Sequence, residues 1–305
     1  MADHQFNPDD VAVNNGNIFW FPVTEDEADL VLLPVPFDTT ASLGKGTAAG
    51  PKGILEYSTQ LDFYHHTVSH AWKQKIFWAP IPEDVIHQNN QFSEDVLTYI
   101  KNLEEGTDNF NHAIVQKVNA YQSELKSQLK NKALSLLHQG KKVGIIGGAH
   151  SVPLGLIEAL GEQHESFGIL QIDAHCDLRV GYEGFEQSHA SIMSNALQTK
   201  GVKKLVQVGI RDASPKEMEL AIADARISCF TDFYLHNQMY QGKTWRHLCK
   251  KIVDYLLDQV YISFDIDGLT PYHCPNTGTP VPGGLNFNQA VCLLWELKRQ
   301  GKTII

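Results

Sequence analysis

The stretch GILQIDAHCDLR, Gly168–Arg179, begins as an apolar run and ends with polar side chains at alternate positions. In an extended strand, alternate side chains point to the same face, so Asp173, His175 and Asp177 should converge on one point. A near-continuous apolar run is typical of a strand that is buried on both faces of a parallel sheet. The stretch therefore predicts an α/β fold in which one buried strand ends at a functional site.

Similar apolar runs recur along the chain at 28–37, 141–148, 202–210, 259–267 and 302–305, and helical patterns separate them. The clearest helical pattern covers 111–139, with apolar residues at steps of three or four. Alternation of strands and helices indicates a parallel sheet covered on both faces, with sites at the carboxyl ends of the strands. The polar, acidic segment 80–111 has only a short helical pattern near 96–103. We expect it to be a surface excursion, with a lid as the alternative.

Composition restricts the class of protein. The 305 residues suit one sizeable domain, 1–305, and no segment has the long uncharged apolar run that spanning a membrane requires. The N-terminal MADHQFNPDD has neither the basic start nor the apolar stretch of a secretory signal, and five cysteines are scattered singly. We therefore expect a soluble cytoplasmic protein with reduced thiols. A formal charge of −10 disfavours nucleic acids and anionic membranes as partners and leaves a small-molecule substrate.

Three predicted strand ends carry side chains of the kind that bind metals. His150 follows the Gly147-Gly148 turn, and Asp265 and Asp267 stand two residues apart after another apolar run. Four carboxylates and two imidazoles buried together would need cations to compensate their charge. A set without thiolates suits two divalent ions of the manganese kind, with nickel, iron or cobalt also possible, rather than a sulfur-rich structural zinc site. The candidate ligands are His150, Asp173, His175, Asp177, Asp265 and Asp267.

Each motif alone also fits a simpler explanation. DAHCD could consist of capping aspartates and a packed histidine, and SFDID alone is weaker still. The joint occurrence of these motifs at strand ends favours metal binding. Cys176 alternates out of the ligand face, so we expect it to be a small buried side chain.

Four motifs resemble the successive signatures of the ureohydrolase family, which contains arginase, agmatinase and formiminoglutamase. They are GGAHS (147–151), DAHCD (173–177), SFDIDGLTP (263–271) and GTPVPGG (278–284). The resemblance covers most of the chain from Val35 to Gly284. It implies a three-layer α/β/α arginase-like fold with a mainly parallel central sheet, a pair of metal ions that is usually Mn²⁺, and a homo-oligomer, either a trimer or a hexamer.

The resemblance also implies roles for particular residues. His150 and Asp177 would bind one ion, His175 and Asp267 the other, and Asp173 and Asp265 would bridge both. Water shared by two divalent cations loses a proton near neutral pH, which suits attack on a guanidinium carbon to release urea and an amine. His189, in EQSHAS, resembles the family's mobile proton shuttle and would be catalytic together with Asp177. Its alternative is a histidine of a surface loop.

Three departures from the family pattern bear on substrate and activity. Ala149 stands where the family commonly has an acid, and Arg179 stands where arginases have an asparagine, which disfavours arginine and favours the agmatinase-like branch. DLR also occurs in formiminoglutamases, where a cation could hold a carboxylate. The sequence ends at KTII, where the family begins a strand that delivers a substrate-binding glutamate, so we expect that the family's C-terminal segment is lacking. Glu183 and Glu186 are the alternative acids for the guanidinium.

Two other classes of protein stay open at this point. A zinc-dependent deacetylase shares the general fold but uses one metal, and the metal content per chain separates the two. A catalytically silent metal-binding homologue is the second alternative, motivated by Ala149 and the ending at KTII. A guanidino-acid hydrolase or formiminoglutamase is the alternative within the family.

Overall fold

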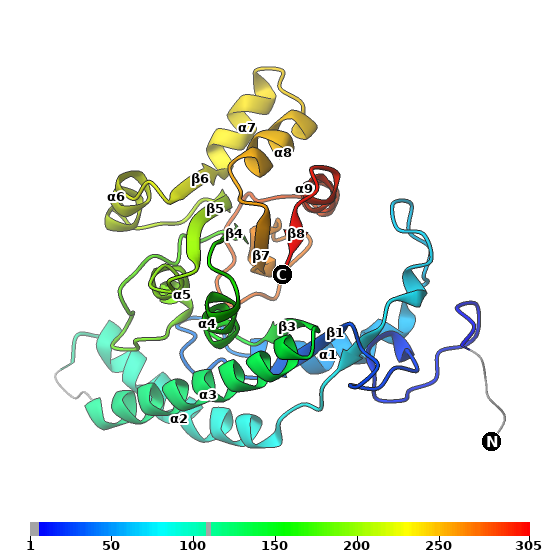
Figure 1. Cartoon of the computed structure of the whole chain (residues 1–305). Coiled ribbons are helices and arrows are strands. Elements are labelled where there is room, and N and C mark those ends of the chain that lie inside the picture. The colour runs from blue at the N-terminus through cyan, green and yellow to red at the C-terminus, as the bar shows by residue number, and fades with distance from the viewer. Residues whose placement is uncertain (1–5, 108–110) are drawn as a thin grey trace.

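The computed structural model describes residues 6–107 and 111–305 (Figure 1). The strands within these residues are β1 (Leu30–Val35), β2 (Ile76–Trp78), β3 (Lys142–Gly147), β4 (Phe167–Ile172), β5 (Val202–Ile210), β6 (Ile227–Thr231), β7 (Gln259–Phe264) and β8 (Thr303–Ile304). The α-helices are α1 (Gly50–Tyr57), α2 (Glu83–Glu104), α3 (His112–His138), α4 (Leu154–Gln163), α5 (Ile192–Ala196), α6 (Pro215–Ala223), α7 (Asp232–Tyr240), α8 (Trp245–Asp254) and α9 (Phe287–Arg299).

All strand pairs within the described residues are parallel. The strands form two hydrogen-bonded blocks, in the orders β2-β1-β3 and β6-β5-β4-β7-β8. The predicted strands are confirmed as β1, β3, β4, β5, β7 and β8, whereas β2 and β6 were not predicted. β2 has only three residues, and in β6 only Ile227 and Phe230 are fully buried, so neither forms a long apolar run. The carboxyl ends of neighbouring strands lie at one edge of the sheet.

Helices cover both faces of the five-stranded block and form the expected α/β/α layers. On one face, Leu136 of α3, Ile157 of α4 and Met193 of α5 belong to one buried cluster. On the other face, Ile252 of α8 and Leu293 of α9 pack with strand residues in a second cluster. Figure 1 shows α5 and α9 on opposite sides of the central strands. β4 is therefore buried from both sides along its whole length, up to the residues that precede the candidate ligands.

The segment 80–111 differs from its prediction. Where we expected a surface excursion with a short helical pattern, α2 is a helix of 22 residues. Its buried side chains include Val85, Phe92, Val96 and Ile100, which are spaced by multiples of a helical turn among many polar residues. Phe92, Val96 and Ile100 share a cluster with residues of α3, and Figure 1 shows the two helices side by side. The sparse apolar stripe is sufficient to stabilise α2 because α3 supplies the apolar residues on the other side of the contact.

The structure contains the long helix and the C-terminal strand that the sequence predicted. The helix predicted for 111–139 is confirmed as α3, from His112 to His138. The strand predicted at KTII is confirmed as β8, which pairs with β7 through Gln259 and Val260. Among the described residues, no helix combines the length and the apolar character needed to cross a membrane.

Candidate metal centre

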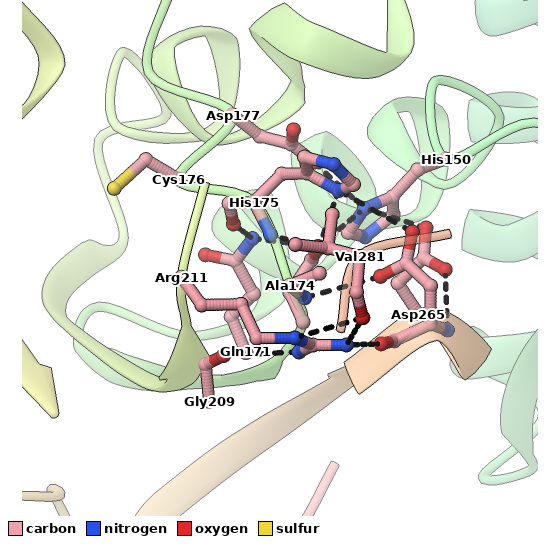
Figure 2. Close-up of polar contacts among 12 residues, drawn as sticks. His150, Gln171, Ala174, His175, Cys176, Asp177, Gly209, Arg211, Asp265 and Val281 are labelled. Carbon is pink, nitrogen blue, oxygen red and sulfur yellow. Dashed lines mark hydrogen bonds and ion pairs between the residues drawn. The ribbon is translucent and has the colours of Figure 1, made fainter. Parts of the chain in front are cut away.

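The six predicted ligand residues come from three strand ends. His150 follows β3, Asp173, His175 and Asp177 follow β4, and Asp265 and Asp267 follow β7. β4 and β7 are hydrogen-bonded neighbours, and Ile172 lies opposite Phe264 in the register, so these two strand ends are adjacent. The structure brings the side chains together at this edge of the sheet (Figure 2).

The first set of contacts surrounds His150. Its Nδ1 atom lies 2.8 Å from Asp177 Oδ2, 3.0 Å from Asp173 Oδ2 and 3.3 Å from Asp265 Oδ2. This nitrogen is buried, yet it makes no hydrogen bond of acceptable geometry. One oxygen each from Asp173 and Asp265 and a ring nitrogen of His150 lie within 4.8 Å of one another and suit a divalent cation, whereas Asp177 contacts His150 but falls outside this group.

The second set of contacts surrounds His175. Its Nδ1 atom lies 3.3 Å from Asp267 Oδ2 and 3.5 Å from Asp173 Oδ1. The other oxygen of Asp267 accepts a hydrogen bond from Ala174 N at 3.1 Å, which turns Oδ2 towards His175. Asp173 thus offers one oxygen to each set. Asp265 groups with His150 and Asp173, so its expected role as a second bridge stays a prediction.

The charges of this cluster are those of a cation site. Burial raises the pKa of Asp265, to about 7, and the nearby negative charges of Asp173 and Asp267 add to this effect. Burial opposes the charged form of His175, but its hydrogen bonds with Asp173 and Asp267 outweigh burial and raise its pKa to about 11. Without metal, the cluster thus has to hold protons that divalent cations would replace. The oxygen and nitrogen ligands therefore fit Mn²⁺ or a similar ion, and these residues could hold two.

The backbone of the ligand turn is strained at one predicted ligand. Asp177 has a φ of +55°, in the left-handed region that residues other than glycine rarely adopt. Its carbonyl oxygen accepts hydrogen bonds from Met193 N and Ser194 N at the start of α5. From this turn the Asp177 carboxylate contacts His150, with 2.8 Å between Oδ2 and Nδ1. Such strain persists where surrounding contacts enforce it, as they often do at functional sites.

A cavity of about 630 Å³ opens beside the candidate ligands. Such a volume suits a small-molecule ligand. His150, Asp265 and Asp267 line it, together with the loops 41–47 and 276–279 and with facing residues of β3 and β7. Among the described residues, neither Glu183 nor Glu186 lines this cavity. The suggestion that one of them holds the guanidinium gains no support from the cavity walls.

The predicted proton shuttle, His189, also lines this cavity. It is half-buried at the start of a short 3₁₀ helix, His189–Ser191, and its ring meets the ring of Tyr182 edge-on at 6.1 Å. Burial lowers the pKa of His189 to about 4, and positive charge on His175 adds to the effect. The imidazole is therefore neutral at pH 7 in the metal-free protein. This placement is compatible with the expected role, which stays a prediction.

Arg211 is a residue of the site that the sequence reasoning missed. It follows β5, and its guanidinium donates hydrogen bonds to the carbonyl oxygens of Asp267 at 2.7 Å, Leu269 at 3.2 Å and Val281 at 3.0 Å (Figure 2). It thereby joins the ligand turn after β7 to the GTPVPGG segment. The only available signal was a charged residue directly after the apolar run 202–210.

Ala149 and Arg179 are the two residues that depart from the family pattern. Ala149 is buried. Arg179 extends towards Glu217, with 3.6 Å between Nε and Oε2, and its guanidinium lies 4.8 Å from the centre of the Tyr182 ring. Because Tyr182 also touches His189, Arg179 is connected to the rim of the cavity through one aromatic ring. Cys176 is fully buried, as expected.

Comparison with known proteins identifies the family. A sequence model described as "Arginase family" matches residues 28–305. The N(1)-aminopropylagmatine ureohydrolase of Thermus thermophilus is 31% identical over 280 residues, which cover 92% of this chain and 81% of that protein. The agmatinase of Bacillus subtilis is 27% identical over 275 residues, covering 90% of this chain and 80% of that protein. The chain therefore belongs to the arginase family, as its motifs predicted, and resembles the agmatinase-like branch.

Solved structures confirm the fold. The agmatine ureohydrolase of Thermoplasma volcanium superposes with a TM-score of 0.69 at 21% identity, over 94% of this chain and 84% of that one. The arginase of Bacillus cereus gives a TM-score of 0.61 at 19% identity, over 90% of this chain and 88% of that one. The predicted three-layer arginase-like fold is thus confirmed.

Proposed function

We propose that this protein is a hydrolase that uses two divalent ions, Mn²⁺ by first choice, to cleave a guanidino C–N bond and release urea and an amine. The observation that carries the proposal is the pair of ligand sets that share Asp173. The oxygen and nitrogen donors can hold two ions, and the adjacent cavity can accept a small substrate. Agmatine or an aminoalkyl derivative is the preferred substrate, in line with the relatives named above.

The proposed chemistry divides between the ions and the chain. When bound, two divalent ions would lower the pKa of a water molecule for attack on the guanidinium carbon. Asp177, held by its strained backbone, orients its carboxylate within the His150 set. His189 lines the same cavity and is neutral at pH 7, so it would take up the proton released by the attacking water and pass it to the nitrogen of the leaving amine.

A second candidate substrate class is a guanidino or formimino acid. It is favoured by Arg179, whose guanidinium lies over the Tyr182 ring, which in turn contacts His189 of the cavity wall. Arg179 would hold a carboxylate at the far end of such a substrate, although Glu217 competes for the same guanidinium.

A substrate panel tests both proposals. Mn²⁺- and Ni²⁺-loaded protein is incubated with agmatine, N1-aminopropylagmatine, 4-guanidinobutyrate, arginine and formiminoglutamate, and urea or formamide is measured. Turnover of the two amines supports the first proposal, and preference for the acids supports the second. A protein that binds metal but turns over none of these compounds is the catalytically silent homologue.

Assembly and location stay predictions. We propose a homo-oligomer, a trimer or a hexamer, which light scattering coupled to size-exclusion chromatography would identify. We also propose a cytoplasmic location, supported by the free cysteines among the described residues.

A further inference from the structure

Two glutamine side chains lie inside the sheet behind the candidate metal centre. Gln171 of β4 and Gln207 of β5 are direct partners in the strand register, and both are fully buried. Burying an amide costs free energy unless hydrogen bonds satisfy it, so such groups are uncommon in apolar strands. The proposed chemistry of the site assigns no role to either residue.

The amide of Gln171 contacts the ligand turn directly. Its Nε2 donates to Asp173 Oδ2 at 2.8 Å and to the carbonyl oxygen of His175 at 3.1 Å (Figure 2). One side chain thus contacts both the shared carboxylate and the backbone of the second imidazole ligand.

Gln207 fixes the orientation of this amide. Its Nε2 donates to Gln171 Oε1 at 2.7 Å and to the carbonyl oxygen of Cys176 at 2.8 Å. A flipped Gln171 amide would lose its contacts with Asp173, His175 and Gln207 together, so only one orientation is compatible with its surroundings. The Oε1 atom of Gln207 is buried without a partner among the described residues. The pair therefore leaves one acceptor unsatisfied while both amide groups donate to the ligand turn.

The hydrogen bonds of Asp173 show what this arrangement achieves. An ionised carboxylate has about two acceptor sites on each oxygen. On Oδ1, one site accepts the backbone N–H of His175 at 2.7 Å, and on Oδ2 one site accepts the Gln171 amide. One site per oxygen remains. The oxygens lie 3.5 Å and 3.0 Å from the ring nitrogens of His175 and His150, so each remaining site is available to a different ligand set.

We propose that Gln171, held by Gln207, is a positioning residue that orients the Asp173 carboxylate so that it can bind both ions at once. The proposal rests on the two-ion function above and deepens it. Without the amide, the Asp173 carboxylate can rotate and must be reordered when the metals bind. Loss of such outer hydrogen bonds typically weakens metal binding about 10- to 100-fold.

The test compares Mn²⁺ affinity in matched variants. Gln171→Met removes the amide at similar volume, and Gln122→Met does the same to a buried glutamine of α3 that donates to the Gln187 carbonyl instead. Free Mn²⁺ is measured by electron paramagnetic resonance during titration, and folding is checked by thermal unfolding in EDTA. We expect about 10- to 100-fold weaker Mn²⁺ binding in Gln171→Met and less than a twofold change in Gln122→Met.

A second variant separates positioning from general packing. Gln207→Met should weaken Mn²⁺ binding in the same direction but less, since Gln171 can still reach Asp173. The double variant, with both Gln171→Met and Gln207→Met, should bind Mn²⁺ no more weakly than Gln171→Met alone, because both residues act through one carboxylate. Should Gln171→Met fail to fold, a loss of affinity in folded Gln207→Met supports the proposal and an unchanged affinity overturns it.

Other outcomes are equally decisive. Mn²⁺ affinity of folded Gln171→Met within twofold of wild type, an equal loss in Gln122→Met, or additive losses in the double variant would each overturn the positioning role. A wild-type chain that binds no Mn²⁺ would instead contradict the proposed two-metal function.

Discussion

The Nε2 atom of His150 lies 2.8 Å from the hydroxyl oxygen of Ser263. Ser263 is buried in β7, two residues before Asp265, and the opposite ring nitrogen of His150 faces the three carboxylates. If Nδ1 binds a metal, Nε2 must carry the ring proton and donate a hydrogen bond to the Ser263 hydroxyl oxygen. With a metal on Nδ1, this contact would hold the His150 ring in its metal-binding orientation.

Removing this contact should weaken metal binding without unfolding the protein. We expect Ser263→Ala to lower Mn²⁺ affinity about tenfold, because His150 would lose the acceptor that orients it. Ser228→Ala, in strand β6 away from the ligands, is the matched control. Titration of both variants with Mn²⁺ checks the prediction, and equal affinities would show that the hydroxyl group does not support His150.

Metal content distinguishes the proposed centre from that of a one-metal deacetylase. Because two ligand sets share Asp173, we expect two Mn²⁺ ions per chain by elemental analysis after loading and gel filtration. Metal should also raise the unfolding temperature, since ions bound only by the folded state add about 2.7 kcal/mol of stability at a free concentration 100-fold above their dissociation constant. One ion per chain, or an unfolding temperature that does not respond to EDTA, would contradict the two-ion centre.

The proton-shuttle role of His189 predicts a separation of turnover from metal content. His189→Asn should lower kcat about 10²- to 10⁴-fold, the usual contribution of a general acid, while the chain still binds two ions. His236→Asn, on α7, is a control at a partly exposed histidine outside the cavity that His189 lines. A loss of turnover below about tenfold would mean that water or another group protonates the amine.

The sequence predicted most of the candidate site because its ligands follow from local rules. Strand alternation predicted that Asp173, His175 and Asp177 lie close together, and parallel strands bring their carboxyl ends to one edge. The physical reason differs in part, because β4 ends at Ile172 and Asp177 reaches His150 from a turn with a left-handed backbone. Arg211 and Gln171 could not be found in this way. The hydrogen-bond partners of Arg211 are backbone carbonyls as far along the chain as Val281, and those of Gln171 include a neighbouring strand; neither leaves a pattern in the sequence.

Most of helix α2 was missed for a related reason, since only a short helical pattern near 96–103 was predicted. A helix is recognised by its apolar stripe, and most residues of α2 outside its stripe are polar. Its stability comes from packing against α3, with Val96 and Val118 in one buried cluster. Such tertiary contacts override a weak local pattern.

The loop before His189 predicts a specific dependence of stability on pH. Glu183 has a φ of +53°, and burial raises its pKa to about 7, with the negative charge of Glu104 adding to the effect and Lys45 opposing it. Between the ordinary value of 4.5 and about 7, folded Glu183 keeps its proton while the unfolded chain has lost it. The folded state then binds more protons, so this group makes stability fall as pH rises through that range, and the full cost is present above pH 7.

We therefore expect Glu183→Gln to flatten the decline of the unfolding temperature between pH 4.5 and 7, measured in EDTA so that metal binding does not interfere. Glu186→Gln, an exposed position on the same loop, should leave the slope unchanged. A slope that is the same in Glu183→Gln and wild type would mean that Glu183 is ionised in the folded protein and that the loop does not depend on its protonation.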